Sequence, residues 1–275
     1  MQQALSYPAP TERPPADAIV RVANLHKSFG PLRVLAGMSL DFLRGQTTVV
    51  LGPSGTGKSV LLKHIVGLLR PDKGEVHFDG QRIDRLGEHD LVAVRKKMGF
   101  LFQMGALFDS HNVLDNICFP LREHTKMSRS EREARGATVL RMVGLPGVEK
   151  KMPADLSGGQ RKRVALARAI VLQPELILYD EPTTGLDPIT SDVINELIRS
   201  LAQTLGITSI AVTHDMVSAR KIGDRMVLLH EGKVIADAET EAFLQLPDDR
   251  VQRFVLGKAD EEDLKAIREG LGCRV

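Results

Sequence analysis

The feature that most constrains this chain is an eight-residue loop at 52–59, in which a glycine, four residues and then Gly-Lys-Ser follow an apolar run. Glycines let successive backbone N–H groups turn toward an anion, and a helix that begins there adds its positive end. We expect Lys58 to reach the phosphates of a nucleotide and the Ser59 hydroxyl to bind Mg²⁺. The members of this phosphate loop are Gly52, Pro53, Ser54, Gly55, Thr56, Gly57, Lys58 and Ser59.

Three short runs of apolar and β-branched residues predict strands buried on both faces of a parallel sheet, and they are 47–51, 176–179 and 207–213. Helix-like stretches follow each run, which is the alternation expected of an α/β fold. At their carboxyl ends stand the phosphate loop, Asp180 with Glu181, and His214 with Asp215. Because open α/β sheets bind ligands at that edge, we expect one shared site. There Asp180 can hold Mg²⁺, and Glu181 can orient and deprotonate an attacking water.

Other segments predict an antiparallel part beside this core. Strand-like runs occur at 19–25 and 34–42. Hairpins are predicted at 74–83 and 226–236, because an Asp-Gly or a Glu-Gly pair separates the two halves of each segment.

A helical part interrupts the α/β pattern between 103 and 156. Ser128 and Glu131 have the spacing of a capping box for a helix that Gly144 can end. We therefore expect a helical subdomain, inserted into the core at about 104–168.

Composition limits the kind of protein this can be. The chain has 275 residues, enough for one large α/β domain or two smaller ones. Its 37 Lys and Arg against 35 Asp and Glu give a formal net charge of +2, so we expect no nucleic-acid partner. No apolar run approaches the ~18 residues of a transmembrane helix, so the chain is not expected to cross a membrane. Cys118 and Cys273 match no metal-ligand or redox spacing.

A second glycine-containing motif, Leu156-Ser157-Gly158-Gly159-Gln160, stands where a helix over 161–171 is predicted to begin. Its two glycines expose backbone N–H groups at that helix start, which makes a second anion site in the same chain. With this pentapeptide the sequence resembles the ATP-binding-cassette (ABC) ATPases, of which it is the signature, over residues 19–236. The resemblance implies a P-loop NTPase core of the α/β class with an antiparallel β subdomain and an inserted α-helical subdomain.

The resemblance also implies roles for four single residues. Phe29 matches the aromatic residue that stacks on adenine, although a phenylalanine in a strand-rich region is more often part of a core. Gln103 matches the glutamine that contacts Mg²⁺ and the attacking water and relays movement to a membrane partner. Asp187 matches an aspartate that reaches across a dimer. His214 matches a histidine that contacts the γ-phosphate, although an isolated histidine after a strand is usually structural.

In this family the signature loop of one subunit covers ATP that the phosphate loop of the other subunit holds. The resemblance therefore implies a homodimer with two composite sites, to which each subunit contributes Ser157, Gly158, Gly159, Gln160 and Asp187. The expected ligands are ATP and Mg²⁺, with the metal on Ser59, Gln103 and Asp180. Glu181, His214 and Gln103 are the expected catalytic residues of an ATPase. Since no motif residue is missing, we do not expect a cassette that has lost hydrolysis.

Within the ABC ATPases, the segment after Gln103 resembles the Mla-type phospholipid-transport ATPases. The match covers 102–110, Val113, 116–117 and 120–125, and Thr213-His214-Asp215-Met216 fits the same group. The resemblance implies phospholipid transport between inner and outer membranes, from a peripheral position on the cytoplasmic face of the inner membrane. The implied partners are a permease of the MlaE type, a lipid-binding protein with an MCE domain and, as a further candidate, a small STAS-domain protein.

Two other functions stay open at this point. The ATPase subunit of an amino-acid or other polar-solute ABC importer would carry the same motifs, and so would a regulatory cassette without a transport role. Four apolar residues after Gln103 are candidates for contact with a permease, and burial in the helical part is an equally good interpretation. They are Met104, Ala106, Leu107 and Phe108.

The domain organisation follows from these patterns. Residues 1–17 are polar, rich in proline and unlike a signal peptide, so we expect a disordered lead into a cytoplasmic protein. The ABC ATPase domain is expected over 18–237. Residues 238–275 are expected to form a C-terminal extension of two or three short helices that packs on the partner cassette or on a small regulator.

Overall fold

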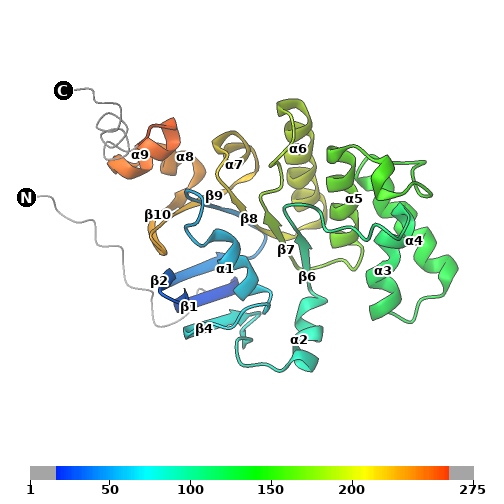
Figure 1. Cartoon of the computed structure of the whole chain (residues 1–275), viewed down its shortest axis with the longest axis horizontal. Helices are drawn as coiled ribbons and strands as arrows, with labels where there is room; N and C mark the ends of the chain where they lie inside the picture. Colours follow the sequence, from blue (N-terminus) through cyan, green and yellow to red (C-terminus); the bar gives the residue numbers. More distant parts are fainter. Residues whose placement is uncertain (1–16, 260–275) are drawn as a thin grey trace, which may run out of the picture.

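The computed structural model describes residues 17–259 as two sheets with helices around them (Figure 1). The expected lead at 1–17, apart from Asp17, lies outside the described residues, as do Cys273 and the rest of 260–275. The smaller sheet is antiparallel and comprises β2 (Leu32–Leu43), β1 (Ala18–Phe29), β4 (Lys73–Phe78) and β5 (Gln81–Arg82), in that order. The larger sheet comprises β10 (Lys233–Glu239), β9 (Arg225–His230), β3 (Thr47–Leu51), β8 (Thr208–Thr213), β7 (Leu176–Asp180) and β6 (Met98–Leu101), in that order.

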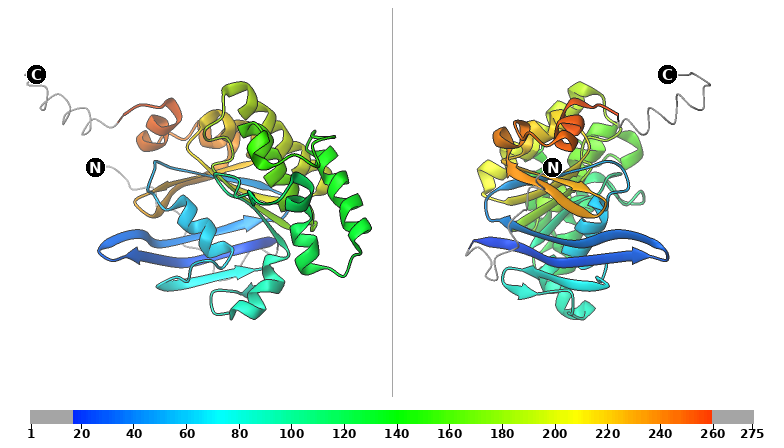
Figure 2. Two further views of the ribbon diagram at one scale, coloured as in Figure 1. Left: turned by 45° about the vertical axis from the view of Figure 1, so that its right-hand side comes forward. Right: turned by 90° about the vertical axis from the view of Figure 1, so that its left-hand side faces the viewer.

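The larger sheet separates two hydrophobic cores. Five of its strands are parallel, and β10 pairs with β9 in the antiparallel sense. Every residue of β3, β7 and β8 is buried, as predicted for strands covered on both faces. On β3, Val49 and Leu51 belong to the core with α5, α6 and α7, whereas Val50 belongs to the core with α1 and the smaller sheet. The smaller sheet therefore forms a second layer over one face of the larger one (Figure 2).

Strand β6 has no counterpart among the predicted strands. It is only four residues long and includes Gly99, so its apolar residues are too few to distinguish a strand from a loop in the sequence. Its place in the sheet comes from parallel pairing with β7. A Cβ atom at Gly99 would lie 2.7 Å from the carbonyl oxygen of Ala169 on α5, so this helix packs directly against the strand backbone. β6 is a strand because of these tertiary contacts.

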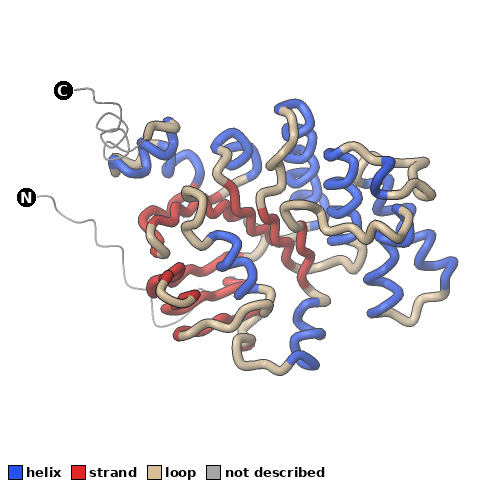
Figure 3. The backbone as a smooth tube through the Cα atoms, in the orientation of Figure 1, coloured by secondary structure: helices blue, strands red, loops and turns tan. Residues whose placement is uncertain are grey.

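The helices fill the space around the larger sheet, as the tube drawing shows (Figure 3). They are α1 (Lys58–Ile65), α2 (Glu88–Arg95), α3 (Val113–His124), α4 (Arg129–Met142), the 3₁₀ turn η1 (Pro153–Asp155), α5 (Gly158–Ile170), α6 (Pro188–Leu205), α7 (Met216–Ile222), α8 (Thr240–Leu244) and α9 (Asp249–Leu256). None of the helices in residues 17–259 is both long and apolar enough to cross a membrane.

The predicted helical part consists of α3, α4 and α5, which pack together beyond β6, away from the smaller sheet (Figure 1). The capping box at the start of α4 is present, because the Ser128 hydroxyl accepts from the N–H of Glu131 and the Glu131 carboxylate accepts from the N–H of Ser128. Gly144 has φ of +68° just after this helix. Local sequence signals thus define both ends of α4.

The described part of the C-terminal extension packs on its own cassette. Strand β10 continues to Glu239, so the expected boundary at 237 falls inside a strand. Phe243 of α8 and Val251 of α9 are fully buried in the same core as β3 and α5. Docking of this extension on a partner cassette and the division at 237 stay predictions.

We predict that Gly74→Ala destabilises the fold strongly. Gly74 has φ of +97°, and a Cβ atom there would lie 2.3 Å from the carbonyl oxygen of Asn24 on β1. The backbone of β1 cannot move away without breaking its ladder with β4. The free energy of unfolding, measured by urea denaturation followed by circular dichroism, should fall by about 3 kcal/mol.

Gly80→Ala is the matched control. Gly80 also has a positive φ, +74°, but no atom lies within 4 Å of a Cβ atom built there. The free energy of unfolding of this variant should fall by only about 1 kcal/mol, the cost of placing a Cβ atom on a residue with positive φ. Equal losses in the two variants would contradict the role given to the close approach at Gly74.

Candidate functional site

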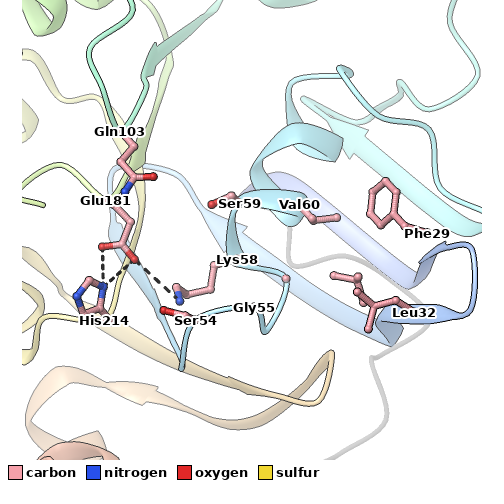
Figure 4. A pocket seen from close by; sticks show the side chains of 12 residues that line it. Phe29, Leu32, Ser54, Gly55, Lys58, Ser59, Val60, Gln103, Glu181 and His214 are labelled. Atoms are coloured by element: carbon pink, nitrogen blue, oxygen red, sulfur yellow. Dashed lines mark hydrogen bonds and ion pairs between the residues drawn. The ribbon is translucent and has the colours of Figure 1, made fainter.

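A cavity of about 430 Å³ lies at the carboxyl ends of β3, β7 and β8 (Figure 4). The parallel pairing places these ends at one edge of the sheet, where Leu51 is opposite Thr213 and Asp180 is opposite Val212. The cavity is lined by Phe29, Leu32, Val34, Ser54, Gly55, Gly57, Lys58, Ser59, Val60, Gln103, Glu181 and His214. The structure therefore brings together residues from the phosphate loop and from four other segments of the chain.

The phosphate loop is shaped by its glycines. A Cβ atom at Gly52 would lie 2.6 Å from the carbonyl oxygen of Leu229, and one at Gly57 would lie 2.7 Å from Cδ2 of Leu35. Both residues also have positive φ, +152° and +96°. Glycine is therefore required at both places for the loop to pass between β9 and β2 and enter α1.

Lys58 is buried at the start of α1, and its ammonium group turns back onto the loop. Nζ donates to the carbonyl oxygens of Gly52 at 2.7 Å and Pro53 at 2.9 Å, and it lies 4.0 Å from the carboxylate of Glu181. Burial lowers the pKa of Lys58, and the charges of Glu181 and Asp180 oppose that shift. The loop thus holds a cation beside its own N–H groups. Pro53 and Thr56 do not line the cavity, and the Thr56 hydroxyl donates to the Pro53 carbonyl oxygen.

Ser59, which lines the cavity from the start of α1, is in contact with Asp180 at the end of β7. The Ser59 hydroxyl donates to Oδ1 of Asp180 at 2.7 Å. Burial raises the pKa of Asp180, and the hydrogen bond from Ser59 opposes this shift. A hydroxyl and a carboxylate oxygen side by side are ligands that Mg²⁺ prefers. Gln103, which follows β6, points its side chain into the same cavity (Figure 4).

Glu181 is surrounded by hydrogen-bond donors. Its carboxylate lies 3.0 Å from Nδ1 of His214, and it accepts from the hydroxyls of Thr184 at 3.1 Å and Thr213 at 3.4 Å. The Glu181 residue is only 9% exposed, although the His214 side chain is 56% exposed. A nearly buried carboxylate held beside an open cavity can accept a proton from a water bound there.

The two threonines were missing from the sequence-based site. Thr213 directly precedes His214, and Thr184 follows Glu181 by three residues, so both stand close to predicted site residues in the sequence. Neither position carries a pattern that distinguishes it from an ordinary strand end or turn. The contact of Thr213 with the Glu181 carboxylate depends on the side-by-side arrangement of β7 and β8, whereas Thr184 reaches the carboxylate from the turn that follows β7.

The signature residues and Asp187 do not line this cavity. Ser157 caps α5: its hydroxyl accepts from the N–H of Gln160, and the Gln160 side chain accepts from the N–H of Ser157. Asp187 is exposed and caps α6 by accepting from the N–H groups of Ile189 and Thr190. A Cβ atom at Gly159 would lie 2.3 Å from Cγ2 of Thr190, so the two helix starts are in direct contact. Within the chain, these residues therefore lie apart from the cavity at the phosphate loop.

Phe29 lies at the edge of the cavity with 47% of its surface exposed. The Lys27 ammonium lies 5.6 Å from the centre of its ring. Phe29 is therefore not a buried core residue, which is the usual place of a phenylalanine in a strand-rich region. An exposed aromatic face next to a phosphate loop is available to stack on a planar ring.

The four apolar residues after Gln103 divide between the two interpretations. Leu107 is partly buried and packs against the core of the helical part, which favours the burial interpretation for this residue. Met104 is 87% exposed and Phe108 is 39% exposed, and Ala106 is also exposed. The Phe108 ring packs on Phe119 of α3 with 4.7 Å between ring centres. An exposed apolar surface therefore stands beside the loop that carries Gln103.

We predict that Asp180→Asn stabilises the nucleotide-free protein near neutral pH. Because burial raises the pKa of Asp180, the folded state binds this proton more tightly than the unfolded state, and stability is lost as pH rises through the folded pKa. Asparagine keeps an oxygen that can accept from Ser59 and carries no charge. The melting temperature of the variant should exceed that of the wild type. The difference should be largest at about pH 8 and should shrink toward about pH 4.

Asp72→Asn is a control with the opposite sign. The hydrogen bond from Lys27, at 2.8 Å, lowers the pKa of Asp72, so its ionised form stabilises the folded state above the unfolded pKa. This variant should melt below the wild type at neutral pH. An Asp180→Asn protein that also melts below the wild type there would show that the buried charge does not weaken the fold.

The chain is similar to proteins of one family along most of its length. The family model described as ABC transporter matches residues 35–184. The intermembrane phospholipid transport system ATP-binding protein MlaF of Haemophilus influenzae is 44% identical over 242 residues, which cover 88% of this chain and 92% of the relative. MlaF of Escherichia coli is 44% identical over 227 residues, covering 82% and 84%. The probable ribonucleotide transport ATP-binding protein mkl of Mycobacterium leprae is 41% identical over 264 residues, covering 94% and 76%.

Solved structures match the fold as well. The ATP-binding cassette MJ0796, in a dimeric post-hydrolysis state bound to ADP and Pi, has a TM-score of 0.75 and 35% identity, covering 80% of this chain and 98% of that one. The cbiO1 subunit of Clostridium perfringens has a TM-score of 0.77 and 29% identity, covering 92% and 99%. The α/β core, the antiparallel sheet and the inserted helices are thus the fold of these cassettes. The chain belongs to the ABC transporter family and is an ATP-hydrolysing, ATP-binding protein of its MlaF subfamily.

Proposed function

We propose that this chain powers the movement of phospholipid between the inner and outer membranes by hydrolysing ATP as a dimer of cassettes. The observation that carries the chemical part is the position of Glu181, whose carboxylate lies 3.0 Å from His214 and 4.0 Å from Lys58 in one cavity. The relatives named MlaF support the substrate class.

The residues of the cavity have different roles in ATP hydrolysis. The phosphates lie on the N–H groups of the 52–59 loop, and Lys58 exchanges its bonds to loop carbonyls for bonds to the β- and γ-phosphates. Glu181 orients a water molecule against the γ-phosphate and accepts its proton on a carboxylate oxygen. His214 contacts the γ-phosphate and, through Nδ1, holds the Glu181 carboxylate in place.

A magnesium ion fits the oxygen atoms that the structure places together. Ser59 and Asp180 would hold it, with the Gln103 side chain as a further ligand from the same cavity. Bound there with the nucleotide, Mg²⁺ would neutralise part of the charge on the phosphates.

The dimer completes the site. Residues 157–160 and Asp187 lie outside the cavity of their own chain, and Ser157 and Asp187 are exposed, which supports the proposal that they cover ATP held by the partner. Phe29, exposed at the cavity edge, stacks on the adenine ring. The solved cassette MJ0796 is described as dimeric.

The membrane partners follow from the same proposal. We place the cassette peripherally on the cytoplasmic face of the inner membrane, bound to a permease of the MlaE type. A lipid-binding protein with an MCE domain and a small STAS-domain protein complete the complex. Met104 and Phe108 form part of the surface that receives the permease, because both are apolar and exposed beside the loop that carries Gln103.

A polar-solute transporter is the second candidate, and one observation favours it. A relative with 41% identity carries the name of a ribonucleotide transport protein. The two substrates can be separated by purifying the complete membrane complex in detergent and identifying what it binds by mass spectrometry. Bound phospholipid together with ATPase activity that phospholipid stimulates supports the first proposal, whereas stimulation by ribonucleotides alone supports the second.

We predict that Glu181→Gln binds ATP and dimerises but hydrolyses ATP at least ~100-fold more slowly, because the amide cannot accept the proton of water. Phosphate release measures turnover, and sedimentation velocity measures the dimer. Glu175→Gln is the matched control, since Glu175 stands near the opposite end of β7 in ion pairs with Lys97 and Arg44. Turnover of the Glu181 variant within tenfold of the wild type would refute its role as the base.

We also predict that Phe108→Glu prevents co-purification of the permease and leaves the cassette folded. The added carboxylate would have to lose its water of hydration in an apolar contact. Val92→Glu on α2 is the control, because Val92 is 40% exposed, close to the 39% of Phe108. The idea of a contact at Phe108 fails if this variant retains the permease as well as the Val92 variant does.

A further inference from the structure

Lys162 is a buried cation that neither the motifs nor the proposed mechanism uses. It lies on α5, two residues after the signature pentapeptide, and is 6% exposed. Its Nζ atom donates to the backbone carbonyl oxygen of Glu181 at 3.1 Å. This is a contact between the helix that carries the signature and the peptide of the proposed catalytic base.

The backbone at Glu181 needs such support. Glu181 has φ of +49°, in the left-handed region that side chains with a Cβ atom disfavour. Its N–H donates to the carbonyl oxygen of Val212 on β8 at 3.0 Å, and its carbonyl oxygen accepts from Lys162 and from the N–H of Thr184. Both peptide groups of this strained residue are therefore fixed by hydrogen bonds, and α5 supplies the charged one.

The charge on Lys162 has a clear cost, because its ammonium is buried. Burial lowers the pKa of Lys162 to about 8, while the charges of Glu181 and Asp180 act in the opposite direction. Among residues 17–259 the ammonium is in no ion pair with a carboxylate, and its hydrogen bond is the one to the carbonyl oxygen of Glu181. An apolar side chain would fill this place without the cost of dehydrating an ammonium. The hydrogen bond to the carbonyl oxygen of Glu181 explains why a lysine, rather than an apolar residue, stands at this position.

We propose that Lys162 is a positioning residue that fixes the peptide of Glu181 and thereby aims its carboxylate at the attacking water. This inference rests on the proposed function, in which Glu181 is the base. In the dimer, the start of α5 would contact ATP on the partner, so Lys162 also connects the signature loop to the base of its own subunit. It does not touch the nucleotide.

The test compares ATP turnover with ATP affinity in variants of the full chain. Lys162→Met should lower kcat by about 10- to 100-fold, the effect of losing a hydrogen bond from a charged donor, and change the Kd for ATP less than twofold. Lys162→Arg should restore kcat to within about threefold of the wild type, because it keeps a charged donor. In a Glu181→Gln background, Lys162→Met should leave the residual rate unchanged, because there is no base left to aim.

Arg163→Met is the matched control. Arg163 is the next residue on α5, and its guanidinium donates to the carbonyl oxygens of Val143 and Gly144, away from the cavity. Its loss should lower the melting temperature and leave kcat within twofold of the wild type. If Lys162→Met is unfolded by circular dichroism, Lys162→Gln, which keeps a neutral donor, is judged by the same split between kcat and Kd.

Three results would overturn the inference: normal turnover in Lys162→Met, an equal loss of turnover in the Glu181→Gln background, or a Kd that weakens in parallel with kcat. Failure of the proposed function looks different. In that case the single variant Glu181→Gln keeps its ATPase activity, and this result does not depend on the Lys162 variants.

Discussion

The parallel register of β3, β8 and β7 is the constraint on which the rest of the structure depends. It places Leu51 opposite Thr213 and Asp180 opposite Val212, so three strands end at the same level of one sheet edge. A slip of one residue in β7 would turn Asp180 to the other face of the sheet and separate it from Ser59. Burial of every residue of these strands prevents such a slip, because it would move apolar side chains between two differently packed cores.

Electrostatics at this edge work against the stability of the fold. Lys58, Lys162, Asp180 and Glu181 are all buried, and burial shifts the pKa values of both lysines and of Asp180 toward their neutral forms. Backbone carbonyls, hydroxyls and the histidine at 214 hold these groups in place rather than close carboxylate–ammonium pairs. Charges held in this way are ready to bind a ligand that carries charge of its own, and the ligand in turn relieves their dehydration.

Much of the fold follows from local patterns. The phosphate loop, the three buried strands, the Asp-Gly hairpin and the capping box of α4 are each specified by residues within a few positions of one another, and all are present. β6 does not follow, because an apolar run of four residues that includes a glycine is too short to predict a strand, and its strand form depends on pairing with β7. The extension after β10 divides in the same way: its short helices are marked by periodicity, but their packing on the chain's own core is not.

The sequence by itself determined which chemistry this protein can do, because the phosphate loop, Asp180-Glu181, the signature and His214 each require particular residue types at fixed spacing. Only the tertiary structure decided how these groups meet. Thr213 and Lys162 reach Glu181 from positions 32 and 19 residues away in the sequence, and Leu107 is partly buried against the core while Met104 is exposed. The physical reason is that a motif is a local property of the chain, whereas a hydrogen bond between α5 and β7 exists only after both have packed on the same sheet.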